Sequence, residues 1–119
     1  MADETAPSAE QVRDEIAREI LRVHEDSYGT GATDLTVHLS GDTVLIVIDV
    51  ELTAAERTLI GASQQEAVKA TREAFQQAIG PTFIAIVERA TGRRVRSFIS
   101  SMEVESLYSI EFFRLEPSS

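Results

Sequence analysis

Between residues 9 and 27 the apolar side chains recur at three- and four-residue spacing, which predicts an amphipathic helix. The side chains that set this spacing are Val12, Ile16, Ile20 and Val23. Gly29 follows in Tyr28-Gly29-Thr30-Gly31, and we expect it to end the helix because glycine adopts a positive φ without strain.

Four later stretches alternate apolar and polar residues, which is the pattern of half-buried strands. They cover residues 35–39, 43–51, 94–100 and 107–115. Ser40-Gly41-Asp42 separates the first two stretches, and residues 102–106 separate the last two. Both connections are short enough for antiparallel partners, so the sequence predicts two hairpins.

The second strand runs directly into a signal for the start of a helix. Leu52-Thr53-x-x-Glu56 has the form of a capping box. In such a box the Thr53 hydroxyl accepts from the N–H of Glu56, and the Glu56 carboxylate accepts from the N–H of Thr53. The short helix that follows is expected to end at Gly61.

Ser63 and Glu66 repeat the same spacing and predict a second capping box, which opens a longer helix. Gly80-Pro81 is expected to end that helix, because proline lacks a backbone N–H and glycine favours helix ends. A further helix, beginning near Phe83, is expected to stop at Thr91-Gly92.

These elements follow the order α-β-β-α-α-α-β-β and predict an α+β fold. Two hairpins with helices between them favour a two-layer sandwich, in which an antiparallel sheet carries its helices on one face. Residues 1–8 are expected to form a disordered N-terminal lead, and residues 9–116 a single domain.

Composition narrows the classes of function. Eleven basic residues against 20 acidic ones give a net charge of −9, which disfavours binding to nucleic acid or to an anionic membrane surface. The absence of cysteine excludes disulfides and thiol catalysis.

The longest apolar run, Val44–Ile48, is far shorter than the roughly 20 residues that span a bilayer. With no secretory signal at the start, we expect a cytoplasmic protein without direct membrane insertion.

Neither His24 nor His38 stands at a recognised metal-ligand spacing, and no nucleophile elbow, P-loop or dinucleotide fingerprint occurs. We therefore expect no catalytic residue, no metal and no cofactor.

Arg72 follows Val68 by four residues and precedes Phe75 by three, which places it beside the apolar stripe of its helix. A semi-buried arginine needs a carboxylate partner, and Glu51 and Glu111 are the expected candidates. An anion-binding site at Arg72 is the alternative.

Arg93-Arg94-x-Arg96 is the basic cluster of the chain. We interpret it as a solvated strand face, or else as a contact for an acidic partner or a small anion.

Leu45 and Val47 lie on the second face of strand 43–51. A single layer of helices covers only one face of a sheet, so this second face is left uncovered. This surplus of apolar surface predicts a homodimer or small homo-oligomer.

Four motifs, in order and at matching spacing, resemble the MpsC-domain family. They are Leu52-Thr53-x-x-Glu56, Val68-x-x-x-Arg72-x-x-Phe75, Thr91-Gly92-x-x-Val95 and Phe112-Phe113-Arg114-Leu115. The resemblance runs from about Val12 to Leu115. Family members tend to carry Ser-Asp where the first strand of the last hairpin ends, and this chain has Ser100-Ser101-Met102 there instead.

The family takes its name from the third component of a sodium-translocating, membrane-potential-generating system. The resemblance implies a small soluble bacterial protein associated with an ion or inorganic-carbon transport complex, whose membrane subunits would be its partners. It supplies no catalytic residue. We expect a non-enzymatic accessory or regulatory domain that acts through protein–protein contacts. The alternative is a small-anion sensor that uses Arg72 or the Arg93/Arg94/Arg96 cluster.

Overall fold

The computed structural model describes residues 7–28 and 32–117. In this part of the chain the elements are α1 (Ala9–Tyr28), β1 (Ala32–Ser40), β2 (Thr43–Val50), α2 (Ala54–Gly61), α3 (Gln65–Thr91), β3 (Val95–Glu103) and β4 (Tyr108–Leu115). Most of the predicted N-terminal lead over residues 1–8 lies outside the described residues, and so does the predicted helix end at Gly29.

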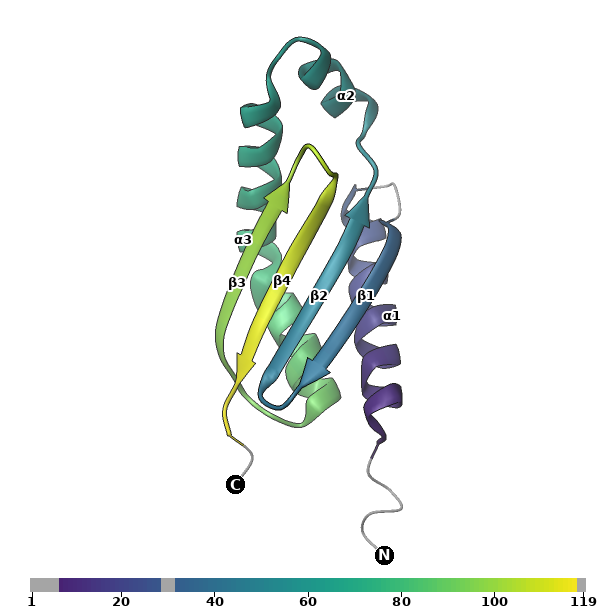
Figure 1. Ribbon diagram of the computed structural model, residues 1–119, viewed down its shortest axis with the longest axis vertical. Coiled ribbons are helices and arrows are strands. Elements are labelled where there is room, and N and C mark those ends of the chain that lie inside the picture. Colours follow the sequence, from purple (N-terminus) through teal and green to yellow (C-terminus); the bar gives the residue numbers. More distant parts are fainter. Residues whose placement is uncertain (1–6, 29–31, 118–119) are drawn as a thin grey trace, which may run out of the picture.

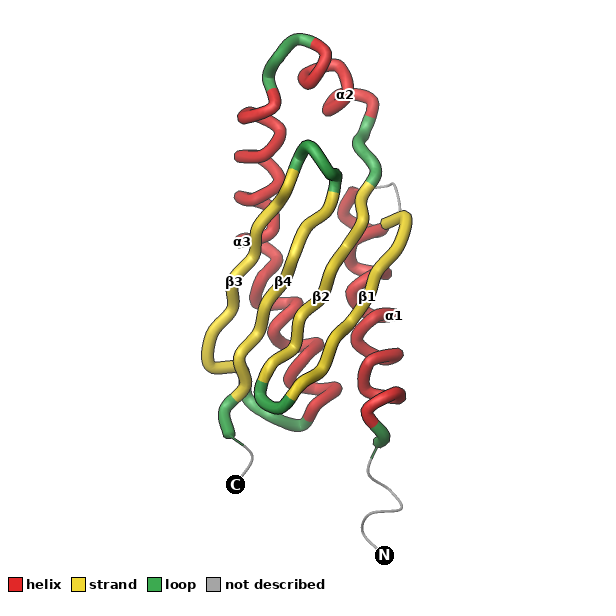
Figure 2. Tube along the Cα trace, viewed as in Figure 1, coloured by secondary structure: helices red, strands yellow, loops and turns green. Residues whose placement is uncertain are grey.

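The four strands form one antiparallel sheet in the order β1-β2-β4-β3, so the two hairpins join where β2 pairs with β4. Both long helices cover the same face of this sheet, with α1 behind β1 and α3 behind the other hairpin (Figure 1). Figure 2 shows the same two layers, with α2 beyond the ends of the strands. The predicted two-layer α+β sandwich is confirmed.

The core lies between the helices and the covered face of the sheet. Every second residue of β2 and β4 points into it, as the strand period of two requires. The buried apolar side chains at its centre are Ile16, Ile20, Val44, Ile46, Ile48, Phe83, Val87, Phe113 and Leu115.

The predicted helix break at Gly80-Pro81 is wrong, because α3 runs through both residues for 27 residues. Pro81 is exposed, so its ring faces water and costs the helix one backbone hydrogen bond. Gly80 is buried, and a Cβ at this position would lie 2.9 Å from Cε2 of the Phe98 ring. The glycine therefore allows α3 to pack closely on β3, and this packing outweighs the local signal for a helix end.

The second predicted capping box, Ser63 with Glu66, does not form. The N-cap of α3 is Gln64, which makes no side-chain capping hydrogen bond. The N–H of Ser63 donates to the Ile60 carbonyl at 3.0 Å, and the N–H of Gln64 donates to the Leu59 carbonyl at 2.8 Å. These two bonds, with Ser63 at φ 61°, are those of a Schellman motif. Ser63 thus ends α2 and does not start α3.

Candidate functional site

Arg72 is the most deeply buried basic residue among those described, with 1% of its surface exposed. Its Nε donates to Oε2 of Glu56 and its Nη2 donates to Oε1 of the same carboxylate, both at 2.7 Å. Nη2 also donates to the Glu51 carbonyl at 3.0 Å. This bidentate pair joins the third turn of α3 to the first turn of α2, and the bond to Glu51 adds the end of β2.

Glu56 has two roles in this arrangement. It completes the predicted capping box with Thr53, which is confirmed: Thr53 N–H donates to Oε1 at 2.8 Å, and Glu56 N–H donates to the Thr53 hydroxyl at 3.1 Å. Burial raises the pKa of Glu56, but the hydrogen bonds from Arg72 and Thr53 outweigh burial and hold this pKa below its usual value. The carboxylate is therefore ionised and held in place from both sides.

The predicted burial of Arg72 against a carboxylate is confirmed, but both expected partners were wrong. Glu51 is exposed and supplies only its carbonyl. Glu111 lies on β4, the strand next to β2, and its side chain points into the core. Its neighbours across the sheet are Ile46 and Ser100. Arg72 can reach Glu56 because the capping box turns the Glu56 side chain back towards the start of α2, and α3 passes beside this point. With all these acceptors in place, the structure gives no support to an anion site at Arg72.

His24 of α1 lies close to this ion pair and is itself buried. Burial, and after it the positive charge of Arg72, lower the pKa of His24, and Glu56 opposes both effects; the result is a pKa of about 4. The imidazole is therefore neutral at pH 7. The three helices meet at this polar cluster of Glu56, Arg72 and His24. His38, by contrast, is exposed on β1.

The predicted basic cluster divides into two parts. The Arg93 guanidinium forms an ion pair with Asp42 and donates to the Gly41 carbonyl at 3.2 Å and the Glu116 carbonyl at 2.6 Å. It fixes the β1–β2 turn to the end of the chain beyond β4, which is a structural role. Arg94 and Arg96 are exposed, and a register shift between Val95 and Ser97 shows that Arg96 occupies a β-bulge.

Glu111 is a buried carboxylate at the centre of the sheet, with 0% of its surface exposed. Neither of its oxygens has a hydrogen-bond partner among the described residues. Burial raises the pKa of Glu111 to about 7, and the nearby hydroxyls of Ser100 and Ser109 oppose part of this rise. Although close, these hydroxyls do not meet hydrogen-bond geometry with the carboxylate. The group is therefore easily protonated near neutral pH.

The face of the sheet turned away from the helices is open, and Figure 1 looks onto it. Leu45, Phe112 and Ile99 stand opposite one another across β2, β4 and β3. Val47 and Ile110 form a second pair one step along the strands. Ile99 is 59% exposed, and the other four side chains are half-buried. The predicted apolar second face of strand 43–51 is confirmed and extends over three strands.

Two adjoining hollows lie at the end of the sheet nearest α2. One, of about 480 Å³, is lined by Gln65, Glu66, Lys69, Glu103, Val104 and Glu105. The other, of about 250 Å³, is lined by Leu52, Ile60, Gln65, Val104, Glu105 and Leu107. Because the two share three lining residues, we treat them as one surface and call it the end groove. Sequence analysis missed it, since its walls come from three separate parts of the chain.

Within residues 7–28 and 32–117, no group of three or more histidine or acidic side chains is arranged to hold a metal ion. None of the helices in the described part of the chain has the length and apolar character needed to cross a bilayer.

The chain was compared with known proteins in three ways. Neither the curated proteins nor the solved structures gave a match. A family model described as "Na+-translocating membrane potential-generating system (MpsC)" matches residues 8–117. This match covers nearly the whole chain and includes the Thr53–Glu56 capping box and the Arg72 position. The chain therefore belongs to the MpsC family.

Proposed function

We propose that this protein is a non-enzymatic accessory or regulatory subunit of an ion-transport system, acting through protein–protein contacts. Membership of a family named for a Na⁺-translocating, membrane-potential-generating system supports the link to transport. The open face of the sheet supports the mode of action. In this account the protein works from the cytoplasm beside membrane subunits that carry the ion.

The apolar open face is the observation that carries the proposal. Fully burying an exposed side chain of this kind is worth about 1.5–3 kcal/mol. Leu45 and Phe112 are already half-buried, so a partner would add only part of that value for each. Five such side chains on one face act together to offset the loss of translational and rotational freedom on association. A surface of this kind on a soluble domain is typical of a protein–protein interface.

We propose a second copy of the chain as the occupant of this face, because its charges are self-complementary. At one end of the face the acidic residues Asp34 and Asp49 stand directly opposite each other. At the other end lies Arg114, which is exposed and stands opposite Thr43 of β2 in the strand register. A two-fold axis perpendicular to the strands would place Arg114 of each copy over the acidic end of the other. An isologous dimer of this kind buries the apolar rows at its centre.

Ion transport in the native host tests the proposed function. We expect deletion of the gene to lower the Na⁺-dependent membrane potential, read with a voltage-sensitive dye, and wild-type protein to restore it. Ile99→Lys should fail to restore it, because a charge enters the apolar face at a position too exposed to affect folding. Ala85→Lys, which adds the same charge on an exposed position of α3, is the matched control and should restore the potential.

Two results would contradict the proposal. A deletion strain with unchanged membrane potential would remove the link to transport. Full restoration by Ile99→Lys would show that the open face has no part in the function. Circular dichroism of both purified variants establishes that each is folded.

A further inference from the structure

The end groove has an apolar floor. Leu52, Ile60, Val104 and Leu107 line its smaller hollow, and all four are half-buried, so their side chains are reachable from solvent. On its outer side stands α2, an eight-residue helix with no buried residue, whose Leu59 is 39% exposed. Val104 and Leu107 also pack against the core on one side. The solvent-facing sides of the four floor residues, together with Leu59, leave a strip of apolar surface that is separate from the open face.

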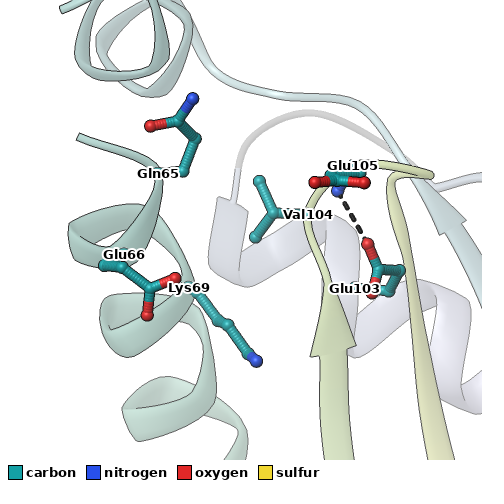
Figure 3. A pocket seen from close by; sticks show the side chains of 6 residues that line it. All are labelled: Gln65, Glu66, Lys69, Glu103, Val104 and Glu105. Carbon is teal, nitrogen blue, oxygen red and sulfur yellow. Dashed lines mark hydrogen bonds between the residues drawn. The ribbon is translucent and has the colours of Figure 1, made fainter. Parts of the chain in front are cut away.

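The rim of the end groove is acidic. Figure 3 shows Glu66 and Lys69 on the first turns of α3, facing Glu103 and Glu105 at the end of β3 and in the turn beyond it. Three carboxylates thus stand against one ammonium group in the larger hollow. Because the whole chain carries −9, the field around the groove attracts cations and repels acidic partners.

The wall on the β3–β4 side is held in position. The Glu105 N–H donates to Oε1 of Glu103 at 3.0 Å within the turn. The Leu107 carbonyl accepts from the N–H of Val50 at 3.0 Å, which fixes the turn to the end of β2. Leu107 itself has φ 56°, a left-handed conformation that a leucine adopts only under constraint. The groove is therefore preformed on this side, which lowers the entropic cost of binding.

We propose that the end groove binds a short segment of a partner protein that carries apolar side chains flanked by lysine or arginine. The apolar residues of such a segment would lie over Ile60 and Leu107, and its basic residues would meet Glu103 and Glu105. The identity of the partner rests on the proposed function. Loops on the cytoplasmic side of membrane proteins are enriched in lysine and arginine, so a loop or terminus of a transport subunit has the required chemistry.

Binding of a labelled model peptide tests this inference without any transport assay. The probe is a helical peptide with leucines along one face and lysines on the rest, and its partner probe replaces each leucine by serine at the same charge. Fluorescence anisotropy measures both. We expect the leucine peptide to bind at least about tenfold more tightly than the serine peptide, as the loss of one buried aliphatic contact already implies.

Two pairs of variants separate the groove from general charge attraction. Glu105→Lys should weaken binding of the leucine peptide about tenfold or more, whereas Glu25→Lys, the same change on an exposed position of α1, should weaken it far less. Ile60→Ser should weaken binding of the leucine peptide and leave the serine peptide unaffected. If Glu25→Lys weakens binding as much as Glu105→Lys does, the attraction is nonspecific and the proposal is overturned.

Amide shifts in the wild-type protein provide a second measurement that needs no variant. Saturating leucine peptide should move the NMR signals of Gln65, Val104 and Glu105 and leave those of β1 in place. Shifts confined to the open face would overturn the groove assignment. Since these readouts use purified protein, they can fail while the transport link holds, and they can succeed while it fails.

Discussion

Arg72 and Glu56 form a bidentate ion pair in which the guanidinium side chain is 2% exposed and the carboxylate side chain 12% exposed. The same carboxylate closes the N-terminal capping box of α2. One side chain therefore fixes both the start of a helix and its position against α3, and the two roles cannot be removed independently.

This double role sets the order of stability of two variants. Thr53→Ala should lower the free energy of unfolding by about 0.5–2 kcal/mol, the usual cost of a lost N-cap. Glu56→Gln should cost more, about 3–5 kcal/mol, because it leaves Arg72 buried without a counter-charge. Urea melts of both variants measure the difference. A cap role alone predicts the opposite order, since an amide oxygen can still accept from the Thr53 N–H.

The Schellman motif after α2 predicts a stabilising substitution. Ser63 has φ 61°, a conformation that costs most L-residues roughly 1–2 kcal/mol and glycine almost nothing. Ser63→Gly should therefore raise the free energy of unfolding by up to about 1 kcal/mol, after the greater freedom of glycine in the unfolded chain is allowed for. Thermal melts test this, with Ser106→Gly in the exposed β3–β4 turn as the control. If Ser63→Gly lowers the free energy of unfolding, the Schellman interpretation is wrong and Ser63 stabilises the start of α3 instead.

Two buried groups make the stability depend on pH in opposite senses. The pKa of Glu111 is raised from 4.5 to about 7, so its contribution to stability is complete below 4.5 and is lost as pH rises to about 7. The pKa of His24 is lowered from 6.5 to about 4, so its contribution is complete above 6.5 and is lost as pH falls to about 4. Between pH 4.5 and 6.5 the two effects oppose each other.

Replacing either Glu111 or His24 should reveal the pH dependence of stability that comes from the other residue. Urea melts of Glu111→Gln should show stability rising with pH between 4.5 and 6.5, because only the His24 effect is left in that range, and the variant should gain most over wild type above pH 7. His24→Gln should show stability falling over the same range. A pH profile of Glu111→Gln identical in slope to that of wild type would mean that Glu111 is not protonated in the folded protein.

The proposed antiparallel dimer predicts a charge exchange. Arg114→Glu and Asp49→Arg should each weaken self-association, because each places like charges together at both ends of a two-fold interface. The double variant restores opposite charges and should recover most of the affinity. Sedimentation at low and high salt measures the dimer affinity of wild type and of all three variants. Equal dimer affinity in wild type and both single variants would exclude this orientation of the two copies.

Local signals in the sequence predicted local structure well. The Thr53–Glu56 box, the two hairpins and the apolar second face of strand 43–51 all depend on residues within a few positions of one another. The break at Gly80-Pro81 failed because its outcome depends on Phe98, 18 residues beyond Gly80, against which the helix packs. Local preference is a weak guide where tertiary packing supplies more free energy.

The polar partners could not be predicted for a similar reason. Glu56 and Arg72 are 16 residues apart, and the predicted topology favoured Glu51 and Glu111 as partners, while Glu56 was interpreted only as a helix cap. The alternation of β4 did place Glu111 on the same face as Phe113 and Leu115, so its burial was visible in the pattern. The end groove left no such signal, since α2, α3 and the β3–β4 turn contribute only one to three residues each.

The mass of the protein in solution is the most direct test of the central claim, that this chain acts through contacts made by its open sheet face. Light scattering coupled to size exclusion, at micromolar concentration and above, should give twice the chain mass of 13.1 kDa for wild type. Ile99→Lys should shift the mass towards that of one chain, and Ala85→Lys should not. A wild-type mass of 13.1 kDa at every concentration would contradict the proposed dimer.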